Sequence, residues 1–416
     1  MRILLYAINF APELTGAGKY TGEMAQWLTA RGHEVRVVTA PPYYPQWQVQ
    51  PPYRANRWQR ERWQGIEIWR CPLWVPPKPG GLKRLLHLAS FALSSLPVML
   101  GQARWRPDWI LMVEPTLFCA PTTLLTAQLA GAHSWLHIQD FEVDAAFELG
   151  LMAAPSARRL ALGLERGLLR RFSQVSTISE KMYERLLAKG VARAQASLFP
   201  NWVDLQAVQP LAHPSVFRAE LGLADDAVVA LYAGNMGQKQ GLEILIDAAR
   251  LLQDQPRLVF VLAGAGSARS RLETLAADLP NVRWLPLQPV ERLNELLNLA
   301  DIHLLPQRAD AADLVMPSKL TGMLASGRPV VASAAPDTQV ARVVNGCGLV
   351  VLPGDAHAFA AALRELAADP ARRHELGLAA RAQAEHDLGC EAILSRFERT
   401  ALAALTTPSF DSEVKP

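Results

Sequence analysis

The chain has 416 residues, 50% of them hydrophobic, which is enough for two domains that each bury a core. Its 42 lysine and arginine residues nearly balance 39 aspartate and glutamate residues, so the net charge of +3 does not indicate nucleic acid as a partner. The cysteines have no C-x-x-C spacing, which disfavours a zinc site and a disulfide framework and favours a reducing cytoplasm; they are Cys71, Cys119, Cys347 and Cys390.

The N-terminal residues 1–14 begin with a short apolar run that stops at Pro12 and has no small-residue cleavage site. We therefore expect a first β-strand there and not a signal peptide. Residues 85–101 are a longer apolar stretch, but His87, three serines and Pro97 interrupt it. This stretch suits burial, or a position on a bilayer surface, better than a membrane span.

Short runs rich in valine, isoleucine and leucine recur along the chain, each followed by a longer helical pattern. Strands that are apolar on both faces and alternate with helices are typical of a parallel sheet covered on both sides. We therefore expect a doubly wound α/β protein. The predicted strands are residues 2–8, 34–40, 108–115, 134–140, 175–179, 227–234, 257–264, 282–287, 302–307, 329–334 and 348–353.

The series of strands breaks between Asn201 and Pro214, where prolines and a lack of periodicity predict a linker. We expect a Rossmann-like N-terminal domain over residues 1–205 and a Rossmann-like C-terminal domain over residues 206–405, facing each other across an interdomain cleft. The last helices could pack back on the first domain. The polar, aperiodic residues 406–416 are expected to be a disordered tail.

In open parallel sheets ligands bind at the carboxyl ends of the strands, so the residues after each strand are the candidates for a site. After the first strand, Gly16 and Gly18 precede a helix expected from about Lys19 to Ala30. Backbone N–H groups of such a loop can approach an anion. The loop could equally be a tight turn without a ligand, and its spacing is not the G-x-G-x-x-G of a dinucleotide site.

Four polar side chains that can carry chemistry lie within eight residues at the end of the strand at 134–140. Singly they are more often structural or solvated, but together at a strand's carboxyl end they predict a working site. They are His137, Asp140, Glu142 and Asp144.

Three loops of the second half could hold a phosphate group. Each combines glycines or a serine with the start of a helix, and two of them carry a lysine. Individually each loop is a common strand-to-helix turn, but three in one domain suit one nucleotide diphosphate. The loops contain Gly234, Gly237, Lys239 and Gly241; Gly264 and Gly266; and Ser318 and Lys319.

These residues resemble the retaining glycosyltransferases of family four, which have the two-domain GT-B fold. The resemblance covers almost the whole chain, through residues 12–39, 176–191, 200–204, 234–243, 281–306 and 318–333. Within that family the chain looks most like the colanic acid biosynthesis fucosyltransferases, through residues 12–28, 39–47, 136–150 and 311–331.

The resemblance implies that the C-terminal domain binds the nucleotide sugar and that the N-terminal domain binds the acceptor. His137 would lie near the transferred sugar, as an acid-base group or as a positioning group. Lys239 and Lys319 would be catalytic by neutralising the diphosphate, so that neither a metal nor another cofactor is expected. Asp140 and Glu142 would hold acceptor hydroxyl groups. The expected donor-binding residues are Gly16, Gly18, Gly234, Asn235, Gly237, Gly266, Asp313 and Ser318.

The chain departs from the family pattern in the donor domain. Two glutamates, separated by seven residues, usually hold the donor sugar and the ribose, but Leu314 and Gly322 stand at their positions. Asn235 replaces a usual arginine, and Lys239 lies one place early.

Two accounts of these departures compete. In the first, Asp310 or Asp313 replaces a hydroxyl contact, while Ser318 and Lys319 take more of the diphosphate. In the second, the chain is a non-catalytic GT-B scaffold. We favour the first, because the glycine loops and both lysines occur together.

Residues 54–106 carry ten basic residues against Glu61 and Glu67, with six tryptophans in or beside them. This composition indicates either a membrane-contacting face or an ordinary solvated surface over a tryptophan core. A second basic amphipathic helix is expected at residues 156–172. The basic residues are Arg54, Arg57, Arg60, Arg62, Arg70, Lys78, Lys83, Arg84, Arg104 and Arg106, and the tryptophans are Trp47, Trp58, Trp63, Trp69, Trp74 and Trp105.

We expect a cytoplasmic enzyme, peripheral to the inner membrane, that moves fucose from GDP-fucose to a lipid-linked oligosaccharide in exopolysaccharide or lipopolysaccharide assembly. The alternatives are a nucleotide-sugar epimerase of the same fold and a non-catalytic scaffold. An NAD-dependent oxidoreductase is the weakest alternative, because the chain lacks G-x-G-x-x-G. The base and sugar of the donor, the acceptor linkage and the oligomeric state stay open.

Overall fold

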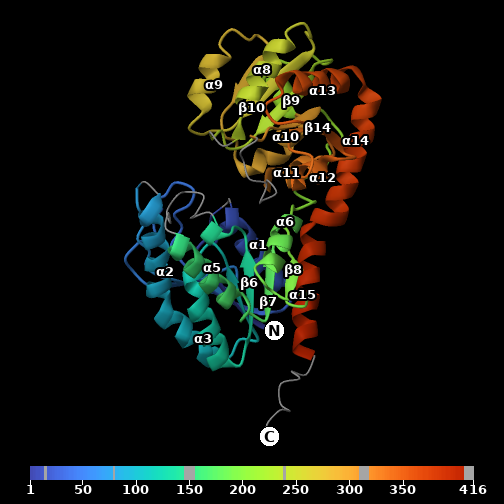
Figure 1. Cartoon of the computed structure of the whole chain (residues 1–416). Helices are drawn as coiled ribbons and strands as arrows, with labels where there is room; N and C mark the ends of the chain where they lie inside the picture. Colours follow the sequence, from blue (N-terminus) through green and yellow to red (C-terminus); the bar gives the residue numbers. More distant parts are fainter. Residues whose placement is uncertain (14–15, 78–79, 145–154, 238–239, 309–317, 407–416) are drawn as a thin grey trace. The chain divides into compact units, whose positions relative to one another are not determined.

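A computed structural model of the protein describes residues 1–13, 16–77, 80–144, 155–237, 240–308 and 318–406. The chain forms two compact units, Met1–Pro200 together with the chain from Leu394 on, and Asn201–Ile393 (Figure 1). The division falls slightly before the boundary expected at residues 205 and 206, and the end of the last helix belongs to the N-terminal unit. Helices lie on both faces of a mainly parallel sheet in each unit.

The N-terminal unit has the strand order β3-β4-β2-β1-β5-β6-β7-β8, parallel except for the antiparallel pair β3 and β4. Its strands are β1 (Arg2–Ala7), β2 (Glu34–Thr39), β3 (Gln59–Trp63), β4 (Ile66–Arg70), β5 (Trp109–Val113), β6 (His133–Ile138), β7 (Gln174–Thr177) and β8 (Ala196–Leu198). Its helices include α1 (Gly16–Ala30), α2 (Gly81–Gln102), α3 (Ala120–Ala130), α5 (Pro155–Leu169), α6 (Glu180–Ala188) and most of α15 (Cys390–Thr406).

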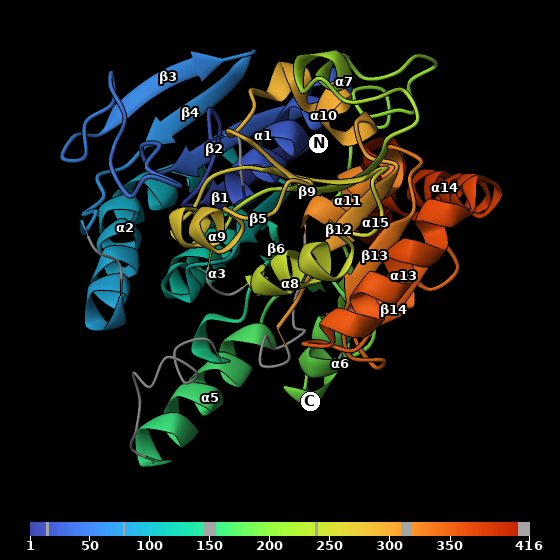
Figure 2. The ribbon, with the colours of Figure 1, turned by 90° about the horizontal axis from the view of Figure 1, so that it is seen from above.

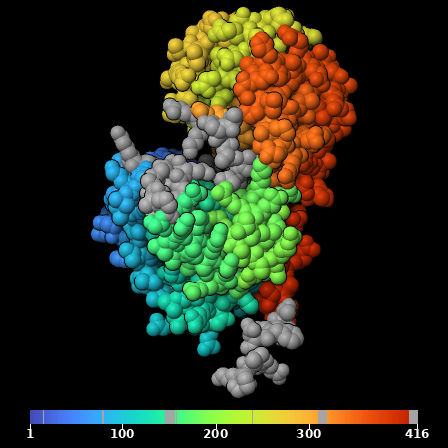
Figure 3. All heavy atoms as spheres, in the orientation of Figure 1, coloured from blue at the N-terminus to red at the C-terminus, as the bar shows by residue number. Residues whose placement is uncertain are grey.

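The two faces of this sheet are covered by different helices. Tyr6 and Met112 belong to the buried cluster shared with α2 and α3. On the opposite face Phe397 of α15 lies 4.6 Å from the Trp135 ring, and the Trp109 indole N–H donates to the Ala401 carbonyl at 3.1 Å. Figure 3 shows α15 in red beside the green surface of α6 and β8. The last helix therefore completes the N-terminal core.

The hairpin of β3 and β4 is not predicted by apolar periodicity, because β3 is charged and at most half-buried. Its turn places Gln64 and Gly65 at φ values of 50° and 84°, the conformation that tight hairpins require. Arg70 at the end of β4 is buried, and it donates to the Ala11 and Ala40 carbonyls at 2.7 and 3.0 Å. Arg70 therefore braces the sheet, and its expected place on a basic surface is wrong.

The C-terminal unit has the strand order β11-β10-β9-β12-β13-β14, with parallel pairs throughout. Its strands are β9 (Val228–Ala233), β10 (Leu258–Ala263), β11 (Val282–Leu285), β12 (Ile302–Leu305), β13 (Val330–Ser333) and β14 (Gly348–Val351). Its helices include α7 (Val216–Glu220), α8 (Glu243–Leu251), α9 (Arg269–Leu275), α10 (Leu293–Asn298), α11 (Ser318–Ala325), α12 (Gln339–Val344), α13 (Ala356–Ala368) and α14 (Pro370–Gln383).

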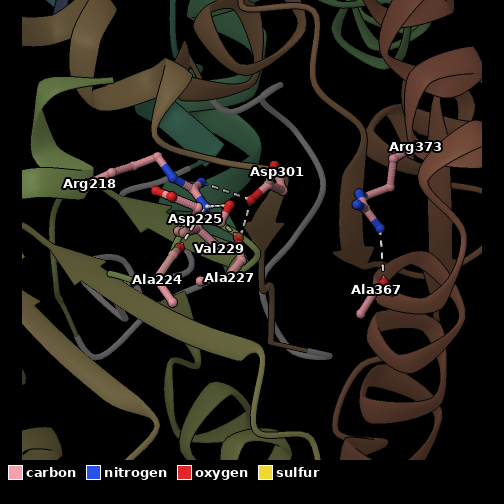
Figure 4. Close-up of polar contacts among 8 residues, drawn as sticks. All are labelled: Arg218, Ala224, Asp225, Ala227, Val229, Asp301, Ala367 and Arg373. Atoms are coloured by element: carbon pink, nitrogen blue, oxygen red, sulfur yellow. Dashed lines mark hydrogen bonds and ion pairs between the residues drawn. The ribbon is translucent and has the colours of Figure 1, made fainter. Parts of the chain in front are cut away.

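The amino ends of β9 and β12 are tied together by Arg218 and Asp301 (Figure 4). Asp301 Oδ2 accepts from the Val229 N–H at 2.8 Å and lies 3.3 Å from the Arg218 guanidinium, which also donates to the Ala227 carbonyl at 2.5 Å. These contacts fix the end of the sheet that lies away from the glycine turns. The carboxyl ends of the same strands are therefore held on a rigid base.

Candidate functional site

The turns after β9 and β10 lie at the same edge of the C-terminal sheet, because the two strands pair in parallel. Gly234 follows β9 with φ 146° and Gly264 follows β10 with φ 144°, values that L side chains rarely adopt. A Cβ atom on Gly264 would lie 3.0 Å from the Gly234 carbonyl carbon and closer still to its oxygen. The two turns therefore pack backbone against backbone.

Gly266 extends this contact, with φ 155°. The Met236 N–H donates to the Ala265 carbonyl at 2.8 Å, and a Cβ atom on Gly266 would lie 2.8 Å from Asn235 Oδ1. The structure thus brings the loops with Gly234 and Gly266 together, as the sequence predicts. Backbone N–H groups in such turns suit an anion.

Lys319 reaches the same edge of the sheet from α11. Its ammonium nitrogen donates to the Tyr232 hydroxyl at 3.0 Å and lies 4.4 Å from the centre of the Tyr232 ring. A Cβ atom on Gly234 would lie 3.7 Å from that nitrogen, so the charge stands beside the turn after β9. Burial lowers the pKa of Lys319 to about 8, which is still high enough for a cation at neutral pH.

Other expected donor contacts differ in what the structure says of them. Lys239, Asp310, Asp313 and Leu314 lie outside the described residues. Ser318 is the first residue of α11. A Cβ atom on Gly237 would lie 2.7 Å from Gln240 Oε1, so the turn closes on a polar side chain of its own loop.

Gly322 stands where the family pattern has the second glutamate, and the structure gives this glycine a packing role. A Cβ atom there would lie 3.2 Å from the Leu297 side chain of α10, which is tighter than an ordinary contact. Glycine at this position therefore lets α11 pack closely on α10, and a glutamate would have to displace Leu297.

The glycines after β1 are not ahead of a helix, as expected, but inside the first turn of α1, which begins at Gly16. A Cβ atom on Gly16 would lie 3.5 Å from the Tyr44 ring. A Cβ atom on Gly18 would lie 2.6 Å from Glu13 Oε2. The bare backbone at Gly18 therefore makes room for a buried carboxylate within the unit.

Glu13 ties the loop after β1 to a neighbouring turn. Its Oε1 accepts from the backbone N–H groups of Tyr43 and Tyr44, each at 2.9 Å. Its Oε2 accepts from the Asn9 side-chain amide at 2.9 Å. Burial raises the pKa of Glu13, while these hydrogen bonds oppose the shift. The sequence offers no signal that separates this glutamate from a solvated loop residue.

His137 lies at the carboxyl end of β6 and is buried. Its Nδ1 lies 3.0 Å from the Ser176 hydroxyl, its Nε2 lies 2.9 Å from the Gln139 amide nitrogen, and its ring packs on Phe199. Burial lowers the pKa of His137 to about 3, so the imidazole is neutral at physiological pH. This geometry favours a positioning role for His137 over proton transfer.

Glu142 and Glu114 form a carboxyl pair near His137. Glu142 Oε2 accepts from the Leu117 N–H at 2.7 Å, while its Oε1 is buried without a hydrogen-bond partner. The Glu114 N–H donates to the His137 carbonyl at 2.9 Å. Burial and mutual repulsion, with a contribution from Asp140, raise the pKa of Glu142 to about 7 and that of Glu114 well above its usual value.

Asp144, which belonged to the same expected cluster, has a structural role. Its Oδ2 lies 2.9 Å from Arg185 and 3.1 Å from Lys189, both on or next to α6. Within the described ranges, no group of three or more His, Cys, Asp and Glu side chains is placed to hold a metal ion.

Two residues of these sites were missed by sequence reasoning. Tyr232 ends an apolar strand, where it cannot be told from a core residue by pattern alone. Glu114 could have been found, because it is an acid directly after a predicted strand, the position that was searched elsewhere.

Comparison with known proteins assigns the family. Residues 15–202 match the glycosyl transferase 4-like domain, and residues 227–369 match the glycosyl transferases group 1 domain. The chain is 46% identical over 407 residues to WcaI of Escherichia coli (strain K12), which is named as a colanic acid biosynthesis glycosyl transferase; the match covers 95% of this chain and 98% of that protein.

Solved structures agree with this assignment. Sucrose-phosphate synthase from Thermosynechococcus elongatus has a TM-score of 0.73 at 21% identity, over 97% of this chain and 99% of that one. Anabaena HepE in complex with UDP-glucose has a TM-score of 0.67 at 18% identity, over 97% of this chain and 100% of that one. At these identities the likeness shows the fold alone. The chain is a glycosyltransferase of GT-B fold and belongs to the group 1 family with a glycosyl transferase 4-like N-terminal domain.

Proposed function

We propose that the protein transfers fucose from GDP-fucose, with retention of anomeric configuration, to a lipid-linked oligosaccharide of a colanic acid-like polysaccharide. The observation that carries this proposal is the similarity to WcaI along nearly the whole of both chains. The Lys319 ammonium beside the glycine turns supports the use of a nucleotide sugar, the kind of ligand present in the HepE structure.

The chemistry requires stabilisation of the departing diphosphate. The bond from the sugar C1 to the β-phosphate oxygen breaks, and the acceptor oxygen bonds to C1 on the same face. The acceptor hydroxyl gives its proton to the β-phosphate. Lys319 and the backbone N–H groups of the glycine turns would stabilise the charge that gathers on the diphosphate, and we propose that no resident metal is needed for it.

The proposed sugar fits the departures from the family pattern. Fucose is a 6-deoxy sugar, so it has no O6 hydroxyl group that a carboxylate must hold. Loss of the acids at Leu314 and Gly322 therefore removes contacts that this donor can spare. GDP-fucose is accordingly the donor to test first.

Helix α2 supports an acceptor at a membrane surface. Leu82, Leu86 and Leu93 lie on one side of the helix and are 69%, 51% and 72% exposed. The opposite side, with Phe91 and Met99, is buried in the core. The helical stretch Gly81–Trp105 is long and apolar enough to cross a membrane, but 39% of its most apolar part is buried in the protein. We infer that α2 lies along a bilayer.

The surroundings of this leucine stripe suit anionic lipid. Residues 80–106 contain no aspartate or glutamate. Trp58 and Trp74 are exposed, and the Trp58 indole N–H donates to the Ser94 carbonyl of α2 at 3.0 Å. Figures 1 and 2 place α2 at the outer edge of the N-terminal unit. Basic residues and indoles beside an apolar stripe are what an interfacial helix uses.

The other expected tryptophans do not join this face, which corrects the prediction for them. Their rings pack on aromatic or guanidinium groups inside the unit, which explains why they are not exposed. They are Trp47 against Tyr43, Trp63 against Phe10, and Trp69 and Trp105 against Arg36.

Helix α5 carries a second surface of the same character. Leu160 and Leu164 are 65% and 61% exposed, while its Glu165 is buried in an ion pair with Lys189. Its outer face is therefore basic and apolar. The exposed arginines on or just after α5 are Arg158, Arg159, Arg166, Arg170 and Arg171. We propose a cytoplasmic location, peripheral to the inner membrane.

A turnover assay tests the reaction. Purified protein is incubated with GDP-fucose and a lipid diphosphate-linked oligosaccharide in vesicles, with and without EDTA. The expected product is one deoxyhexose heavier and has the donor's anomeric configuration by NMR, with or without chelator. Transfer from UDP-glucose alone would reject the donor, and conversion of the donor without acceptor would indicate an epimerase.

A further inference from the structure

The Tyr232 hydroxyl lies between a proposed catalytic cation and the glycine turn. It accepts a hydrogen bond from Lys319 Nζ at 3.0 Å and donates one to the Asn235 carbonyl at 2.5 Å. The Lys319 ammonium also stands over the Tyr232 ring, 4.4 Å from its centre, which adds a cation–π attraction. One side chain therefore links α11 to the turn after β9.

Tyr232 is built to hold one position. Its side chain is fully buried, in a cluster that includes Leu262 and Met236. Close packing at this density leaves an aromatic ring no alternative site. Burial raises the pKa of Tyr232, so the hydroxyl stays protonated and keeps its single hydrogen for the Asn235 carbonyl. The oxygen then faces Lys319 only as an acceptor.

This contact leaves Lys319 able to bind an anion. An ammonium group has three N–H donors, and the Tyr232 hydroxyl takes one of them. A neutral acceptor does not cancel the charge, whereas a carboxylate in its place would compete with phosphate. The position beside Gly234 puts the remaining donors at the turn whose backbone is open to a ligand.

We propose that Tyr232 is a positioning residue for the diphosphate: it holds the Lys319 ammonium at the Gly234 turn before the donor binds. The inference rests on the proposed diphosphate-binding role of Lys319. Preorganisation of this kind avoids the entropy cost of ordering a lysine side chain when the ligand arrives. Tyr232 touches Lys319 and the turn and is not itself assigned a contact with the substrate.

Isothermal titration with GDP and with inorganic pyrophosphate tests this role in the wild type, Tyr232→Phe, Lys319→Ala and the double variant. Phenylalanine keeps the packed ring and removes only the hydroxyl. We expect Tyr232→Phe to weaken both ligands about tenfold, the size of one hydrogen bond to a charged group. In the Lys319→Ala background the same substitution should change nothing, because its effect passes through the lysine.

A matched control removes another buried tyrosine hydroxyl. Tyr6→Phe breaks a contact of 2.5 Å with Ser95 in the N-terminal unit and should leave both affinities unchanged. A second readout is the pH at which pyrophosphate affinity falls on the alkaline side. Tyr232→Phe should move that pH lower, since the lost hydrogen bond favoured the charged lysine.

The outcomes separate this inference from the function on which it rests. Wild-type protein that binds neither GDP nor pyrophosphate would overturn the diphosphate site and the role of Tyr232 together. Normal wild-type binding with equal affinities in Tyr232→Phe would overturn the role of Tyr232 alone. A fall in thermal stability of Tyr232→Phe with an unchanged alkaline midpoint, or the same loss in the Lys319→Ala background, would show a merely structural tyrosine.

Discussion

The Gly234 peptide occupies the space in which a side chain on Gly264 would begin, so the turns after β9 and β10 can only pack as they do with glycine at 264. We expect Gly264→Ala to lower the free energy of unfolding by about 2–4 kcal/mol and to weaken GDP binding, because the two turns must separate. Urea unfolding and titration with GDP measure both effects.

Gly354→Ala is the matched control for that substitution. Gly354 also has a positive φ, 81°, but nothing lies within 4 Å of an added Cβ atom. Its loss should be about 1 kcal/mol, from backbone strain alone, with GDP affinity unchanged. Equal losses in the two variants would contradict the steric account of Gly264.

The pKa of Lys319, lowered to about 8 by burial, predicts a pH dependence for donor binding. Above this pH the lysine becomes neutral and loses its attraction for the diphosphate, so GDP affinity should fall as the pH rises from 8 to 10. At pH 9, binding should take up protons, because the bound anion raises the pKa of the lysine. Calorimetry in buffers of different ionisation enthalpy measures this uptake.

Lys319→Arg provides the comparison for the pH effect. A guanidinium group stays charged over this range, so the variant should bind GDP with a flat profile, more weakly because its shape differs. A wild-type affinity that is constant from pH 7 to pH 10 would remove Lys319 from the diphosphate site.

Glu142 predicts how stability changes with pH. Its folded pKa of about 7 lies above the usual value of 4.5. Stability from the protonated form is therefore complete below pH 4.5 and is lost as the pH rises through 7. Glu142→Gln should gain on the wild type across this window, by on the order of 3 kcal/mol. Denaturant unfolding from pH 4.5 to 8 measures the difference.

The exposed Glu184→Gln serves as the control for Glu142, and its difference from the wild type should not change with pH. A constant difference for Glu142→Gln would mean that Glu142 is ionised in the folded protein throughout, contrary to its burial.

The leucine stripe of α2 should be required for membrane association. We expect the Leu86→Glu, Leu93→Glu double variant to lose flotation with vesicles that contain anionic lipid, because two carboxylates replace apolar contact and repel the headgroups. Leu378→Glu, at a residue 60% exposed in the C-terminal unit, is the control and should float as the wild type does. Equal flotation of the wild type with neutral and anionic vesicles would contradict the electrostatic part of this account.

Most of the fold could be predicted from the sequence, because each parallel strand is apolar on both faces and alternates with a helix. All of the strands predicted from apolar runs are present. The hairpin of β3 and β4 and the short β8 escaped, since their side chains are at most partly buried and the apolar pattern is weak. Burial of Arg70 could not be foreseen, because its partners Ala11 and Ala40 are carbonyls distant in sequence.

The candidate site was predictable in its loops but not in its internal contacts. Glycines after strands announce turns at one edge of a parallel sheet, so Gly234 and Gly266 could be placed together. The contact of Tyr232 with Lys319 joins residues 87 positions apart, and the pattern of either segment does not require it. Gly18 shows the converse, because its bare backbone is explained by Glu13 and not by a ligand alone.

The most direct test of the central account is the thermal stabilisation of the purified protein by a panel of nucleoside diphosphates and nucleotide sugars, because a ligand that binds only the folded state raises the melting temperature. The account predicts a selective rise with GDP and GDP-fucose that is lost in Lys319→Ala. A rise with UDP-sugars alone would contradict the donor, and no rise with any nucleotide, also when lipid-linked acceptor is present, would contradict the enzyme and favour a scaffold.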